Sequence, residues 1–156
     1  MNFEQILNLL IGSAEEKAKP SELIKACYKF NMLQIEYINI NGDPLFDIGY
    51  NFIFQTQSGE EARLEIIEID GNLLQSGIQI IYKPRIFFEK INKDFSYLYN
   101  AIQSHYINEQ PHRHKGIELH NFFNETSQCY LSKSKVNEQD VLNFRVTNKD
   151  IWEKYI

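Results

Sequence analysis

Residues 47–56, Asp-Ile-Gly-Tyr-Asn-Phe-Ile-Phe-Gln-Thr, decide the fold class of this chain. Bulky side chains stand at every second position from Ile48 to Thr56, and mostly polar or small residues such as Asn51 and Gln55 stand between them. Because successive side chains of a strand point to opposite faces, a period of two predicts a β-strand with one buried face.

Three further segments with the same period flank this strand. They cover residues 33–40, residues 62–66 and residues 78–82, and the alternation changes parity at Ile38, which predicts either a bulge or a strand buried on both faces at its end. Turn-forming segments separate the strands: Asn41-Gly42-Asp43-Pro44, Ser58-Gly59 and Asp70-Gly71. Since Asp-Gly is typical of a two-residue hairpin, the sequence predicts a four-stranded antiparallel meander over residues 33–83.

Helical periodicity precedes and follows the meander. The first helix is indicated by Phe3, Ile6, Leu7, Leu10 and Ala14 at helical spacing, and Ser21, after Pro20, caps a second helix that ends near Asn31. These two segments predict an N-terminal helical hairpin. A further helix is expected near residues 94–107, beginning at Asp94 and ending before Pro111.

The C-terminal part shows weaker strand patterns at residues 117–123, 129–132 and 142–146, followed by a turn of helix from Asp150. Hydrophobic residues make up 43% of the chain and charged residues 24%, which excludes wholesale disorder. No internal repeat or linker divides the chain. We therefore expect a single α+β domain over residues 1–156, with a predominantly antiparallel sheet.

Sequence features also predict the compartment. The N-terminal residues carry no basic segment of a secretory signal, and no apolar stretch approaches the roughly 18 residues of a membrane-spanning helix. Cys27 and Cys129 stand among apolar neighbours and are expected to be buried free thiols. These features predict a cytoplasmic protein without a membrane partner.

The net charge of −5 is concentrated in the middle of the chain. Residues 33–82 contain eight acids and a single base, Arg63, which gives this segment a charge of −7, and the flanking segments together carry +2. An acidic surface repels a phosphate backbone and attracts a basic protein. We therefore expect a basic protein partner and no nucleic acid.

Four of these carboxylates are predicted to share one surface. If a bulge separates Ile66 from Ile67, the outer face of the third strand carries Glu61, Glu65, Glu68 and Asp70. Such a row either serves solubility and protects the sheet from edge pairing, or provides electrostatic complementarity to a partner. The second alternative makes these four residues the predicted partner-binding site.

All four histidines lie between residues 105 and 120, and His112, His114 and Glu118 form an H-x-H-x-x-x-E string. This string resembles the first half of the metal motif of cupin barrels, which implies two imidazoles and a carboxylate around a divalent metal. Tyr106 and Glu125 stand where the bracketing glycines of that motif are expected, and no second half follows. A polar strand face after a proline turn is the alternative, and we expect no metal or other cofactor.

No nucleotide-binding loop, nucleophile elbow or zinc knuckle is present in the sequence. No catalytic residue is therefore predicted, and an enzyme is not expected.

The function that we expect is a protein-binding module, specifically an immunity protein that neutralises a nuclease-like toxin domain through its acidic surface. One alternative is a small metal-dependent enzyme or sensor built on His112, His114 and Glu118. Another is a small-ligand carrier or structural subunit with a sheet pocket lined by Tyr50, Phe52 and Phe54. Neither the partner's identity nor the oligomeric state follows from the sequence.

Overall fold

Eight strands and four helices form in the part of the chain that the computed structural model describes, residues 3–15, 18–29, 33–38, 48–56, 59–83, 88–106, 108–114 and 117–155. The helices are α1 (Phe3–Glu15), α2 (Pro20–Lys29), α3 (Phe88–Gln103) and α4 (Lys149–Tyr155). The strands are β1 (Leu33–Ile38), β2 (Ile48–Gln55), β3 (Glu61–Ile69), β4 (Asn72–Ile81), β5 (Asn108–His114), β6 (Ile117–Phe123), β7 (Ser127–Val136) and β8 (Gln139–Asn148).

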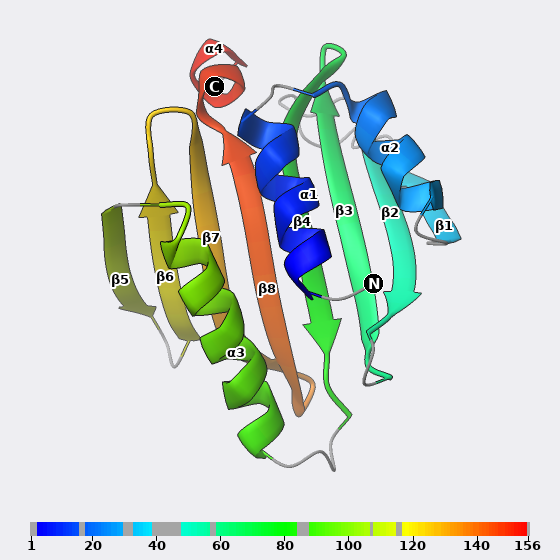
Figure 1. Cartoon of the computed structure of the whole chain (residues 1–156). Helices are drawn as coiled ribbons and strands as arrows, with labels where there is room; N and C mark the ends of the chain where they lie inside the picture. Colours follow the sequence, from blue (N-terminus) through cyan, green and yellow to red (C-terminus); the bar gives the residue numbers. More distant parts are fainter. Residues whose placement is uncertain are drawn as a thin grey trace.

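The strands form one antiparallel sheet in the order β1-β2-β3-β4-β8-β7-β6-β5. Each half of the sheet is a four-stranded meander preceded by helix, and the last strands of the two meanders, β4 and β8, pair at the centre (Figure 1). The α+β class, the antiparallel sheet and the meander from β1 to β4 are confirmed. Outward from the β4–β8 pair, the strands of both halves follow each other in reverse chain order.

Helices α1, α2 and α3 cover one face of the sheet (Figure 1). Helix α1 lies against β4 and β8, α2 against β3, and α3 against β7 and β8. The core between the two layers contains Leu10, Leu64, Leu98, Phe122 and Phe144, all at most 1% exposed. None of the described helices has an apolar stretch long enough to cross a membrane.

Two hairpins have two-residue turns in which both residues adopt the left-handed conformation. Asp70 (φ 49°) and Gly71 (φ 76°) join β3 to β4, which confirms the predicted hairpin. Asn137 (φ 52°) and Glu138 (φ 65°) join β7 to β8 at the equivalent place in the second half. Positive φ at both central residues matches the twist of the flanking strands.

Several predicted boundaries differ from the structure. Helix α3 begins at Phe88 rather than at Asp94, because buried Ile91 extends its apolar face by one turn. Asp94 accepts a hydrogen bond of 2.7 Å from Tyr82 Oη and is not a cap. The helix ends at Gln103, and residues 108–114, expected in part as a turn, form β5. The predicted turn at residues 41–44 lies outside the described residues.

The register of β3 corrects the predicted bulge. Pairing with β2 is continuous along β3, and the irregularity lies opposite it, where Leu74 is an extra residue of β4. The alternation therefore continues through Ile67, which points away from α1–α3 together with Ile69. Both are buried because α4 packs on that face through Ile151 and Tyr155.

A buried carboxylate connects the β2–β3 turn to α3. Glu60 is 2% exposed, accepts a hydrogen bond of 2.7 Å from Thr56 Oγ1, and forms an ion pair with Lys90 of α3. Asp94 lies one helical turn after Lys90 on α3 and accepts a hydrogen bond from the Tyr82 hydroxyl. Burial raises the pKa of Asp94 despite that hydrogen bond. These contacts fix the N-terminal half of α3 against the sheet.

Substituting Lys90→Met removes the cation that pairs with buried Glu60. We expect the free energy of unfolding to fall by about 3 kcal/mol, because a buried charge left without its partner retains its desolvation cost. Urea unfolding at pH 7 measures the change. The double variant Glu60→Gln, Lys90→Met is the control and should recover part of the loss; a Lys90→Met variant as stable as the wild type would contradict this role.

Gly77 of β4 is predicted to be intolerant of a side chain. A Cβ there would lie 2.8 Å from both Arg145 Cγ and the Phe144 carbonyl oxygen, and the carbonyl belongs to the backbone of the paired strand. Gly77→Ala should therefore destabilise the protein by roughly 1–3 kcal/mol in urea unfolding.

Gly12 of α1 is the opposite case, because a Cβ built there would have nothing within 4 Å. Gly12→Ala should therefore stabilise the protein by about 0.5–1 kcal/mol in the same measurement.

Candidate functional site

The sheet face opposite α1–α3, which we call the open face, carries the candidate site. Of the four described helices, α4 packs on this face, at the end formed by the β3–β4 hairpin. On the rest of the face polar side chains predominate around Gly77, and the register also places Ile53, Ile81 and Leu119 on this face. Two hollows lie there side by side, and both include Arg145.

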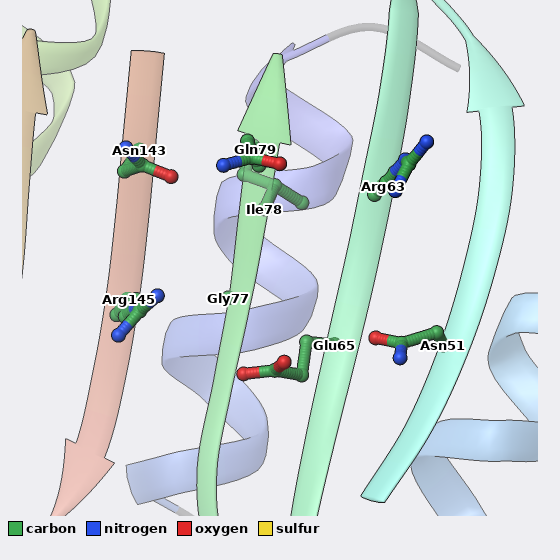
Figure 2. Close-up of a pocket in the computed structure, with 8 residues that line it drawn as sticks. All are labelled: Asn51, Arg63, Glu65, Gly77, Ile78, Gln79, Asn143 and Arg145. Carbon is green, nitrogen blue, oxygen red and sulfur yellow. The ribbon is translucent and has the colours of Figure 1, made fainter. Parts of the chain in front are cut away.

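The first hollow, which we call the central hollow, has a volume of about 190 Å³ and spans β2, β3, β4 and β8 (Figure 2). Its lining residues are Asn51, Arg63, Glu65, Gly77, Ile78, Gln79, Asn143 and Arg145. Most of them are amides or charged groups. The hollow can therefore donate and accept several hydrogen bonds at once.

Gly77 and Arg145 define the centre of this hollow. They are direct partners in the β4–β8 register, and the Arg145 stem lies where a side chain of residue 77 would otherwise stand. Arg145 is exposed, and its guanidinium has no hydrogen-bond or ion-pair partner among the described residues. By contrast, Arg63 Nη2 lies 3.1 Å from Glu61 Oε1. Arg145 is thus a cation whose hydrogen-bonding capacity is available to a ligand.

The second hollow, which we call the aromatic hollow, has a volume of about 300 Å³. It lies under α4, where Trp152, 41% exposed, faces the same space as Tyr130. The amides of Gln75, Asn121 and Gln128 and the hydroxyl of Thr147 complete it, and Thr147 Oγ1 donates to Gln75 Oε1 at 3.2 Å. Tyrosine, tryptophan, arginine and amide side chains are typical of surfaces that bind proteins.

The four predicted partner-binding carboxylates do not form one surface. Glu61 and Glu65 lie on the open face, and Asp70 lies in the β3–β4 turn, where its Oδ2 accepts a hydrogen bond of 2.9 Å from Tyr155. Glu68 lies on the helix-covered face, where its Oε2 accepts a hydrogen bond of 3.2 Å from Tyr50. The single row predicted from the sequence was wrong because the extra residue belongs to β4 and not to β3.

A second polar cluster surrounds His120 on the helix-covered face. His120 Nδ1 lies 2.7 Å from Glu109 Oε1, and its Nε2 lies 3.2 Å from Glu118 Oε1. Tyr99 of α3 donates a hydrogen bond of 2.5 Å to Glu109, and the Tyr99 ring packs edge-on against the imidazole. Lys133 Nζ lies 3.6 Å from Glu118 Oε2. The cluster connects α3 to β5, β6 and β7.

The carboxylates of this cluster have perturbed pKa values. Burial raises the pKa of Glu109, but the hydrogen bonds from Tyr99 and His120 outweigh it and bring the pKa below its ordinary value. The hydrogen bond between His120 and Glu118 likewise lowers the pKa of Glu118, against the effect of burial. The hydrogen bond to Glu109 raises the pKa of Tyr99 to about 12. The cluster therefore holds ionised carboxylates and a neutral phenol.

The predicted metal string is divided between two strands. His112 pairs with Leu119 and His114 with Ile117 in the β5–β6 register, so the two histidines stand on one strand and Glu118 stands on its antiparallel neighbour. The side chains of His112 and His114 lie outside the described residues. Among the side chains that the structure describes, no group of three His, Cys, Asp or Glu is placed to hold a metal ion. The metal alternative stays a prediction.

Both cysteines are buried free thiols, as predicted. Burial raises the pKa of Cys27 to about 12 and that of Cys129 well above its ordinary value. Since the thiolate is the nucleophilic form, neither residue has the environment of a catalytic cysteine.

The chain was compared with known protein families, curated proteins and solved structures. No protein-family model, curated protein or solved structure matches it.

The sequence interpretation missed the amide, arginine and aromatic residues of the open face. A signal exists in β8, where Asn143, Arg145 and Thr147 alternate with apolar residues and so share one face. The pairing of β8 with β4, more than sixty residues earlier, is what brings Arg145 to Gly77. Local periodicity contains no information on that pairing.

The His120 cluster predicts an acid-sensitive contribution to stability. The pKa values of Glu109 and Glu118 are lower in the folded state than the ordinary 4.5, so their contribution is present above that pH and is lost as the pH falls through the folded values. The double variant Glu109→Gln, Glu118→Gln should therefore lose less stability than the wild type between pH 5 and pH 3, as measured by urea unfolding.

Glu153→Gln is the control for this experiment, because Glu153 lies exposed on α4. It should follow the wild-type dependence on pH. A double glutamine variant with the same dependence as the wild type would show that the cluster makes no net contribution.

Proposed function

We propose that this chain is a protein-binding module that docks its partner on the open face. The observation that supports this most is the placement of Trp152, Tyr130 and Arg145 around one hollow of an exposed sheet face. Tryptophan, tyrosine and arginine account for much of the binding energy at protein interfaces, and neighbouring amides adapt their hydrogen bonds to the partner. A rigid sheet also presents these groups at low entropic cost.

The partner class that we propose is a basic toxin domain of the nuclease type, which makes the chain a cytoplasmic immunity protein. The charge of −7 in residues 33–82 supports a basic partner through the long-range field of the molecule, whereas on the open face Glu61 and Glu65 lie beside Arg63 and Arg145. Complementary charge accelerates association and selects the partner. The two buried free thiols are in keeping with a reducing compartment.

Two exposed aromatic residues on opposite sides of the molecule provide a matched test. Trp152 is 41% exposed on α4 beside the aromatic hollow, and Tyr97 is 44% exposed on α3 in the helix layer. Affinity capture from the native host supplies the partner, which is then purified for binding measurements. We expect Trp152→Ala to weaken binding by about 2 kcal/mol, or roughly 30-fold in Kd, and Tyr97→Ala to leave it within twofold.

The toxin assignment adds a functional measurement. One equivalent of the wild-type chain should suppress the activity of the captured toxin domain, and Trp152→Ala should require a clear excess. Binding that depends on Tyr97 and not on Trp152 would place the interface on the helix layer and contradict the proposal. Failure to isolate any partner that binds the purified chain would contradict it as well.

A further inference from the structure

Arg145 occupies a special position on the open face. It stands on β8 next to the centre of the sheet and borders both hollows. Its guanidinium is exposed and has no ion pair or hydrogen bond within the described residues. Gly77 leaves the backbone of β4 bare beneath the arginine stem. A ligand can therefore approach the guanidinium without displacing another side chain.

We propose that Arg145, with the amides of Gln79 and Asn143, forms a subsite for a single carboxylate of the partner protein, an aspartate or glutamate side chain. This inference rests on the proposed function and specifies what the partner places at the centre of the open face. Gln79 and Asn143 are direct partners in the β4–β8 register and line the same hollow as Arg145 (Figure 2). Guanidinium binds carboxylate through two parallel hydrogen bonds, and amide N–H groups add further donors.

The charges around the hollow favour a monoanion. The charge of Arg63 is balanced by Glu61 at 3.1 Å, which leaves Arg145 and Glu65 in the hollow. A phosphate group carries a charge of about −1.5 to −2 at neutral pH and would be repelled by the Glu65 carboxylate more strongly than a carboxylate would. Arg145 is the cation left for a ligand, and a monocarboxylate meets less repulsion from Glu65 than a phosphate does.

The neighbouring aromatic hollow favours a protein over a small free acid. Because Arg145 borders both hollows, a partner segment that places a carboxylate on the guanidinium has Tyr130 and Trp152 within its reach. Apolar contact there supplies affinity, and the charge-assisted hydrogen bonds at Arg145 supply orientation. A partner that is basic overall thus presents one acidic residue to this subsite.

The test uses capped amino acids as probes and the Nε–Hε NMR signal of Arg145 as the readout. Titration with N-acetyl-glutamate N-methylamide should shift this signal saturably, and the uncharged glutamine analogue should not. The shifts of the surrounding residues should disappear in Arg145→Gln and persist in Arg63→Gln, since Arg63 is engaged by Glu61. Sodium chloride at equal ionic strength controls for screening.

Three outcomes would overturn the subsite. They are equal shifts with both probes, an equal response of the Arg63 signal, and saturation by inorganic phosphate at lower concentration than by the glutamate probe. With the purified partner, Arg145→Gln should weaken binding about tenfold while Arg63→Gln stays within twofold. An unchanged affinity in Arg145→Gln, together with a loss in Trp152→Ala, would overturn the subsite and leave the proposed function standing.

Discussion

The pairing of β4 with β8 is the constraint on which the rest of the structure depends. It runs from Gln75 opposite Thr147 to Ile81 opposite Val141 and joins two meanders that are distant in the sequence. Without it, each meander would end in a strand with unpaired backbone groups, which is a template for aggregation. Helix α1 lies over this junction, so that the most protected part of the core is also the part that connects the two halves.

The same pairing creates the open face. Three helices cover one side of the sheet, and α4 returns to the other side, where it buries Ile67, Ile69 and Leu74 and leaves the adjoining polar side chains accessible. At the β4–β8 junction, Gly77 has no side chain, and the stem of Arg145 lies over the space that a side chain there would fill. A flat sheet thereby acquires a shallow polar centre bordered by aromatic rings, and this geometry suits a docking surface better than an enclosed ligand cavity.

Polar contacts hold the helix layer in place on the other side. Glu60 with Lys90, and Tyr82 with Asp94, fix the beginning of α3, and the His120 cluster fixes its later turns to β5–β7. Burying a polar group costs free energy unless the group is hydrogen-bonded. These contacts therefore favour the observed position of α3 over positions in which the same groups would lose their partners. A helix layer fixed in this way keeps the strands in register and hence keeps the open-face side chains in position.

The α+β class, the β1–β4 meander, the Asp70-Gly71 hairpin and the buried thiols could be predicted from the sequence, because each depends on local periodicity, turn chemistry or immediate neighbours. The face on which Glu68 lies could not, since it depends on which strand of a pair accommodates an extra residue, here Leu74. Nor could the candidate site centred on Arg145, because its members come from β2, β3, β4, β6, β7, β8 and α4. The sequence by itself determined most of the segments that become strands and helices, with β5 and the first turn of α3 as exceptions. Only the tertiary structure decided which strands meet and which side chains share a surface, because that choice depends on contacts between residues far apart in the chain.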